Sequence, residues 1–169
     1  MSRSTIPQSS VPVVDVPRGV RLTAQGRQAL TERLERLRGD VLGQLRPHLI
    51  GPERDERDVA EFERTLAEIA RLEAVLASAE PLERPAGGRS ARVQPGSMVE
   101  IQAPAGKGSA TTRVILVHPE EATIDEERIS WDSPLARALL GATAGDRVRV
   151  QSPRGPWTCT VVKVMRPPA

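Results

Sequence analysis

Two segments of this chain carry apolar residues at alternating spacings of three and four, which place them on one face of a helix. The first apolar seam consists of Leu30, Leu34, Leu37 and Val41, continued with a drift by Leu42, Leu45 and Leu49. The second seam consists of Val59, Phe62, Leu66, Ile69, Leu72 and Leu76. Between them lies the turn sequence "PHLIGP" at residues 47–52. Two seams joined by a short turn predict an antiparallel coiled-coil hairpin that begins near Thr23, a good N-cap, and ends before Pro81.

The composition limits what else the chain can build. Its only aromatic residues are Phe62, Trp131 and Trp157, and 38% of all residues are hydrophobic. A core must therefore be assembled from aliphatic side chains, which favours a hairpin plus a small β domain over one large core. Lys and Arg number 24 and Asp and Glu number 22, and a net charge of +2 does not by itself indicate nucleic-acid binding.

The pattern changes after the second seam. Five short β-rich runs follow, at 98–103, 111–117, 128–131, 146–152 and 157–164. A short helix is expected among them, with Ser133 as its N-cap, Pro134 in its first turn and Gly141 just past its end. The prediction is an α+β chain with a small antiparallel sheet. Its expected parts are a disordered or extended arm (1–19), a hairpin (20–80), a linker (81–97) and a β domain (98–169).

Several classes of function find no support in the residues. Cys159 is the only cysteine, so neither a disulfide framework nor a cysteine zinc site is available. His48 and His118 are isolated from any second metal ligand, and no arrangement of a nucleophile with a base can be argued. No apolar run is long enough to span a membrane and no signal peptide is recognisable, so we expect a cytoplasmic protein without a membrane partner.

The stretch "ISWDSPLARALLGATAGDRVRVQSPRG", residues 129–155, resembles the C-terminal domain of the bacterial Gre (GreA/GreB) transcription elongation factors. Their pattern there runs I-S-x-x-S-P-(I/L)-A-R-x-L-(I/L)-G, followed by a turn and a V-x-(V/I)-x-(T/S)-P-x-G strand. The T-x-x-G opening of their first helix is matched by Thr23 and Gly26, and "VLASAEPL" (75–82) resembles the exit from their second helix.

This resemblance implies a coiled-coil hairpin followed by an FKBP-like domain, and bacterial RNA polymerase as the partner. In the family the globular domain docks at the polymerase's secondary channel, and the hairpin enters the channel with carboxylates at its tip. Those carboxylates help to hold a second Mg²⁺ ion in the polymerase active centre, which then cleaves backtracked RNA. Such a protein is an accessory factor rather than an enzyme, has no cofactor of its own, contacts nascent RNA only indirectly, and is expected to be a monomer.

The tip of the expected hairpin carries the acids Asp55, Glu56, Asp58 and Glu61. The family motif D-L-x-E-N-A-E-Y assigns Asp55 and Asp58 to the Mg²⁺ ion shared with the polymerase. The match is partial, because Asp58 stands where the family has Glu and the second arm is about one heptad shorter, or roughly 10 Å. Acids in a first helical turn also complement the helix dipole without any metal. Transcript cleavage and cleavage-free regulation of the same channel therefore both stay open.

The resemblance also assigns a docking surface to the start of the short helix. Asp132, Ser133, Pro134 and Arg137 are the polymerase-binding candidates, and simple capping of the helix is the alternative role for this sequence. Trp131 replaces a small or β-branched residue of the family pattern, as core or as an interface anchor. A different class of function also remains open, in which the hairpin and the β domain form an interaction module for another partner.

Overall fold

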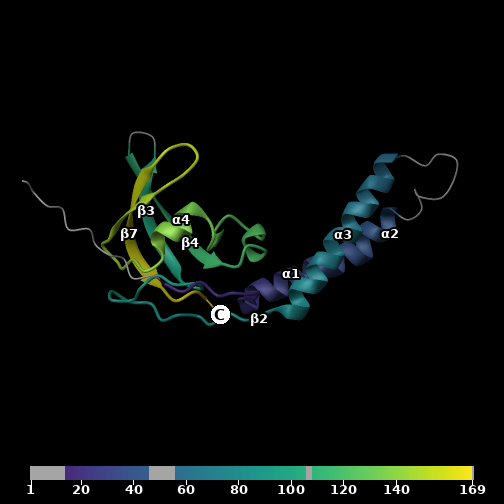
Figure 1. Ribbon diagram of the computed structural model, residues 1–169, viewed down its shortest axis with the longest axis horizontal. Coiled ribbons are helices and arrows are strands. Elements are labelled where there is room, and N and C mark those ends of the chain that lie inside the picture. Colours follow the sequence, from purple (N-terminus) through teal and green to yellow (C-terminus); the bar gives the residue numbers. More distant parts are fainter. Residues whose placement is uncertain (1–13, 46–55, 106–107, 169) are drawn as a thin grey trace, which may run out of the picture.

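A computed structural model describes residues 14–45, 56–105 and 108–168 of the chain. It is an α+β structure in which a long helical arm (residues 24–45 and 56–78) projects from a sheet body (residues 98–165), as Figure 1 shows. The expected turn at 47–52, and with it His48, Leu49 and Asp55, lies outside the described residues, as do residues 1–13 of the expected N-terminal arm.

The first helical segment of the arm is continuous but changes its helix type along its length. It consists of α1 (Ala24–Arg36), the π-helical η1 (Leu37–Val41) and α2 (Leu42–Leu45). The backbone N–H of Leu42 donates to the carbonyl of Leu37, a bond across five residues. A π turn inserts one extra residue into the helix. Leu42 therefore lies on the buried face, although it is five residues after Leu37 and the seam otherwise has spacings of three and four. The π turn is the physical reason for the drift in the first seam.

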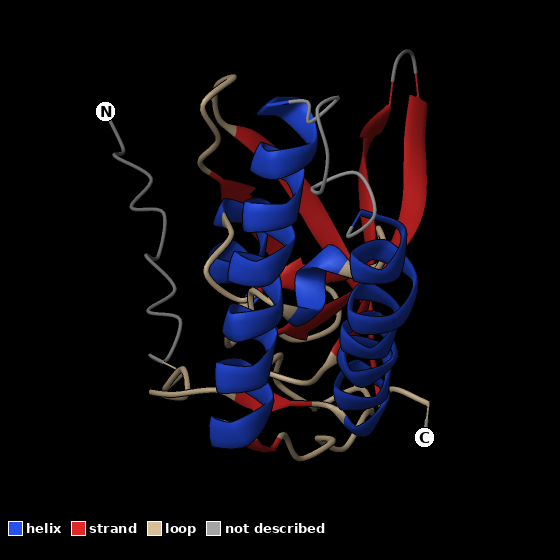
Figure 2. Ribbon diagram, turned by 90° about the vertical axis from the view of Figure 1, so that its right-hand side faces the viewer, coloured by secondary structure: helices blue, strands red, loops and turns tan. Residues whose placement is uncertain are grey.

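The second helix, α3 (Glu56–Ser78), lies beside α1, and the two views in Figures 1 and 2 agree on this arrangement. Leu66, which the spacing places in the second seam, is 44% exposed, while its neighbour Thr65 is buried. The hydroxyl of Thr65 donates to the carbonyl of Glu61, which satisfies the buried oxygen. The shared core of the arm consists of Leu22, Leu30, Leu34, Leu42, Ile69 and Leu72.

The sheet body has five strands in the order β5-β4-β3-β7-β6. Their bounds are β3 Met98–Ala105, β4 Gly108–Val117, β5 Arg128–Ser130, β6 Arg147–Val150 and β7 Trp157–Met165. All five expected strands are present, but the prediction of an antiparallel sheet is wrong at one edge, where β4 and β5 pair in parallel. A parallel pairing needs a crossover rather than a hairpin. Residues 118–127, which include the 3₁₀ helix η3 (Glu121–Thr123), provide that crossover.

The short helix α4 (Pro134–Leu139) packs its buried residues Ala136 and Leu139 on the core of the sheet body. Ser133 is its N-cap, as predicted, and accepts a hydrogen bond from the N–H of Ala136 at 3.2 Å. Gly141 follows the C-cap with φ +82°, a left-handed conformation that glycine adopts without steric cost. The predicted start and stop signals of this helix are both confirmed.

The segment between the arm and the body is tied to both. A pair of two-residue strands, β1 (Arg21–Leu22) and β2 (Glu80–Pro81), joins the two ends of the arm in parallel. Val93, inside the expected linker, is fully buried in the core of the body, and its backbone N–H donates to the carbonyl of Ala142. The segments that connect the arm to the body are therefore held by backbone hydrogen bonds and by core packing.

Candidate functional site

The described tip of the arm is the start of α3, which carries three of the four predicted acids, with Glu56 and Asp58 in its first turn and Glu61 in its second. Glu56 and Glu61 are exposed and Asp58 is half-buried. Negative side chains in the first turn of a helix are stabilised by its dipole, so this turn holds carboxylates at the outer end of the arm. Asp55, the other predicted metal ligand, lies outside the described residues, and the structure therefore does not place the pair.

The four predicted docking residues lie together at the start of α4. Asp132, Pro134 and Arg137 are exposed, and Ser133 is half-buried because its hydroxyl caps the helix. Asp132 and Arg137 approach each other at 3.8 Å, a loose pair between exposed side chains. A groove of about 360 Å³ runs from this edge to the end of β6, and its lining residues are Asp132, Pro134, Arg137, Ala138, Arg149 and Gln151.

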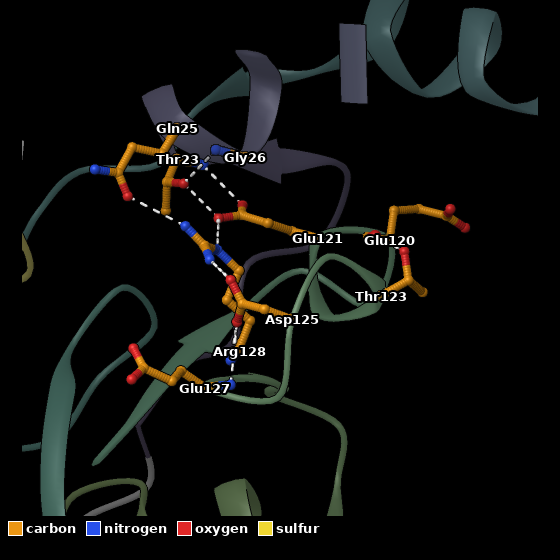
Figure 3. Close-up of polar contacts among 9 residues, drawn as sticks. All are labelled: Thr23, Gln25, Gly26, Glu120, Glu121, Thr123, Asp125, Glu127 and Arg128. Atoms are coloured by element: carbon orange, nitrogen blue, oxygen red, sulfur yellow. Dashed lines mark hydrogen bonds and ion pairs between the residues drawn. The ribbon is translucent and has the colours of Figure 1, made fainter. Parts of the chain in front are cut away.

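A second group of polar side chains joins the arm to the body (Figure 3). The carboxylate of Glu121, on η3, is fully buried. One of its oxygens accepts the backbone N–H of Thr23 at 3.0 Å, and the other accepts the Thr23 hydroxyl. Arg128, on β5, approaches this carboxylate at 3.5 Å and donates to the side-chain oxygen of Gln25 at 3.1 Å. Burying a charged group is costly unless it is paired and hydrogen-bonded, and Glu121 has both kinds of partner.

The sequence reasoning did not identify Glu121 or Arg128. The two ends of the Thr23–Glu121 bond are 98 positions apart, so no local pattern connects them. One signal was available in the sequence. Gly26 occupies the position where a capping box would have an acid, and a missing local acid leaves the N–H of Thr23 in need of another partner.

Burial shifts the pKa of two further groups of the body, His118 and Cys159. Burial lowers the pKa of His118, against the opposing effect of the nearby carboxylates Glu120, Glu121 and Asp132. His118 meets Trp131 edge to face with ring centroids 5.4 Å apart, and Trp131 is buried, so it serves the core rather than an interface. Burial raises the pKa of the Cys159 thiol, which makes it a poor nucleophile.

Within the described part of the chain, no group of three or more His, Cys, Asp or Glu residues is arranged to hold a metal ion. None of the helices described is long and apolar enough to cross a membrane.

The sheet body matches a known family model along most of its length. Residues 89–166 fit the model described as "Transcription elongation factor, GreA/GreB, C-term". The likeness extends over the arm as well. A transcription elongation factor GreA of Pseudomonas aeruginosa is 30% identical over an alignment of 156 residues, and the alignment covers 85% of this chain and 95% of that protein. The chain belongs to the GreA/GreB family.

Other relatives in the GreA/GreB family show similar values. A transcription elongation factor GreA of Alkalilimnicola ehrlichii is 31% identical and covers 86% of this chain and 96% of that protein. Among solved structures, the GreA factor homolog 1 (Gfh1) of Thermus thermophilus is 32% identical over 87% of this chain and 99% of that chain, with a TM-score of 0.37.

The family match includes the groups that the geometry singles out in the sheet body. The capped start of α4, the groove beside it, and Glu121 with Arg128 all lie within residues 89–166. The matched residues thus include the predicted docking residues and the body's side of the contact with the arm.

Proposed function

We propose that this protein binds bacterial RNA polymerase at its secondary channel and regulates transcription elongation, as an accessory factor rather than an enzyme. The observation that carries the proposal is the likeness to proteins named transcription elongation factor GreA, which runs through arm and body alike and spans 95% of the relative's length. The proposal includes the finer architecture, in which the arm is a coiled-coil hairpin and the body is FKBP-like, and a monomer as the acting species.

The start of α4 is the proposed docking edge on the polymerase. Asp132, Pro134 and Arg137 are exposed beside a groove that also contains Arg149. Arginine binds carboxylates with two parallel hydrogen bonds, so the groove suits a partner surface that presents acidic side chains. The Ser133 cap supports this role by fixing the first turn of the helix, and the loose contact between Asp132 and Arg137 leaves both free to exchange partners.

The arm would carry its acids towards the polymerase active centre. Mg²⁺ takes six oxygen ligands and is often bound by one or two carboxylates with water and substrate phosphates. Asp58, with Asp55, has the donor atoms to contribute to such an ion, and it would supply them to a metal held mainly by the polymerase. When bound there, the ion activates a water and neutralises charge in phosphodiester cleavage. Regulation without cleavage requires only that the arm occupies the channel.

One assay separates these outcomes. A backtracked elongation complex is assembled with Mg²⁺, and the wild type and the Asp55→Ala/Asp58→Ala variant are added in parallel. Shortened RNA with the wild type alone supports a metal-assisting tip, whereas intact RNA with slowed nucleotide addition supports cleavage-free regulation. No effect on elongation together with no binding to core RNA polymerase in a pull-down would overturn the proposal and favour a partner outside transcription.

A variant at the docking edge makes the binding test specific. Arg137→Glu reverses the charge beside the groove and is expected to weaken binding to the polymerase. Arg89→Glu makes the same change at an exposed turn before β3, away from the groove, and should bind like the wild type. Equal binding by the two variants would remove the start of α4 from the interface.

A further inference from the structure

The first turn of α1 lacks the acid that would normally complete its cap. In a capping box, the residue three positions after the N-cap provides a carboxylate that accepts the backbone N–H of the N-cap residue. Thr23 is the N-cap, and its hydroxyl accepts the N–H of Gly26 at 2.9 Å, which is half of the motif. The other half should come from the side chain at position 26, where glycine has none.

Glu121 occupies the place of the missing acid. Its carboxylate accepts the backbone N–H of Thr23 at 3.0 Å, the same bond that the acid of a capping box would accept. The capping box of α1 is therefore completed by a residue of the sheet body, which ties the orientation of the helix to the body.

Gly26 is what allows this arrangement. A Cβ atom built on Gly26 would overlap the carboxylate of Glu121, and the three heavy atoms nearest to it all belong to that group. Its φ is not in the left-handed region, so its backbone conformation does not require glycine. Glycine is unfavourable inside a helix relative to alanine, and at Gly26 it leaves the space in which the body's carboxylate reaches the helix end.

Apart from the contacts of Glu121 and of Arg128 with Gln25, the arm meets the body in polar side-chain contacts that each include an exposed partner. Arg33 donates to the hydroxyl of Thr123 at 3.3 Å, and Arg71 pairs with Glu120 at 2.9 Å. In each of these contacts one long arginine side chain remains at least partly exposed, so it can follow small changes of geometry. The buried carboxylate of Glu121 cannot shift in the same way, because moving the arm would remove its hydrogen bonds from Thr23 and leave it the contact with Arg128 of the body.

We propose that Glu121 is a positioning residue that sets the direction in which the arm leaves the sheet body. The helical run from Ala24 to Leu45 covers 22 residues, or about 33 Å at about 1.5 Å per residue, so a rotation of about 10° at its base moves its outer end by about 6 Å. A misplacement of about 1 Å can already reduce the rate about 100-fold at a catalytic site. The consequence for the tip rests on the function proposed above, whereas the orientation itself is a property of the free protein.

The orientation is measured by the distance between two spin labels, one at Ala60→Cys near the outer end of α3 and one at Lys163→Cys on β7. Both positions are exposed, and all proteins carry Cys159→Ala so that only these sites are labelled. The parent protein should give one narrow distance distribution. Glu121→Ala should broaden or shift it, and so should Gly26→Ala, which expels the carboxylate while improving the helix propensity of α1. Gly26→Ala keeps the test valid even if Glu121→Ala does not fold.

A double variant distinguishes positioning from simple capping. Gly26→Glu combined with Glu121→Ala moves the acid onto the helix itself and restores a complete local capping box. We expect its thermal midpoint to recover relative to Glu121→Ala while its distance distribution stays broad. A distribution with the same width and the same mean distance as that of the parent, in the double variant or in both single variants, would overturn the proposal. No polymerase is needed, so failure here is separate from failure of the proposed function.

Discussion

The carboxylate of Glu121 in the body fills the space where a side chain at Gly26 of the arm would lie, and a Cβ atom at Gly26 would displace it. The contact joins residues that are far apart in the sequence, and it lies where the helical arm leaves the sheet body. The stability and the action of this protein should both depend on it.

Gly26→Ala tests the fit directly. Alanine normally stabilises a helix relative to glycine, but here the added methyl overpacks a buried site, so we expect a loss of about 1–3 kcal/mol in the free energy of unfolding. Gly43→Ala is the matched control, because it lies in α2 with no atom near the added methyl and should gain about 0.4–1 kcal/mol. Urea unfolding of the two variants would contradict the account if both gained stability.

The core of the arm should respond to truncation at its buried leucines. Leu72→Ala removes a side chain that is 1% exposed, and the transfer and cavity terms together should cost about 2–5 kcal/mol. Leu66→Ala is the same change on the same helix at a residue that is 44% exposed, and should cost less than about 1 kcal/mol. Thermal unfolding followed by the helical circular dichroism signal compares the two, and equal losses would show that the helices pack through another face.

His118 should make the stability depend on pH. Because burial lowers its pKa in the folded protein, the unfolded chain binds the proton more readily. The contribution of His118 is therefore fully present above the unfolded pKa of about 6.5 and is lost as the pH falls through the lower folded pKa. Free energies of unfolding between pH 7.5 and 5.0 for the wild type and His118→Gln should converge or cross towards low pH. A constant difference would show that His118 does not titrate differently in the folded state.

Cys159 should be unreactive while the protein is folded. Burial raises the pKa of its thiol, so the nucleophilic thiolate is scarce at neutral pH and is also screened from reagents. A chromogenic disulfide reagent should react with it only after unfolding in denaturant, with one thiol released per chain. Rapid reaction of the native protein would place Cys159 at the surface.

Local signals in the sequence predicted much of the fold. Ser133, Pro134 and Gly141 mark the start and end of α4 because caps and left-handed glycines act within one turn. The leucine spacing predicted both long helices, and even the slip between Val41 and Leu42 was visible as a drift. Its cause, a π turn with a bond from Leu42 to Leu37, was not predicted because no residue type specifies that helix.

Relations between distant segments could not be predicted in the same way. The parallel pairing of β5 with β4 depends on the path of residues 118–127, and a three-residue strand gives no sign of its direction. The role of Glu121 could not be predicted without knowing that η3 lies against the start of α1. The docking residues could be named only from the family pattern, and the partner of Asp58 at the tip depends on a molecule outside this chain.

The central claim is that the arm enters the secondary channel of RNA polymerase, and site-specific cross-linking tests it most directly. A photoreactive amino acid replaces Glu61, which is exposed on α3, and in a control protein it replaces Lys163, which is exposed on β7 of the body. After irradiation with a bacterial elongation complex, mass spectrometry identifies the residues reached. The account predicts that position 61 cross-links to residues lining the channel beside the active centre and that position 163 does not. Cross-links from position 61 only to the outer surface of the polymerase, or none at all, would contradict it.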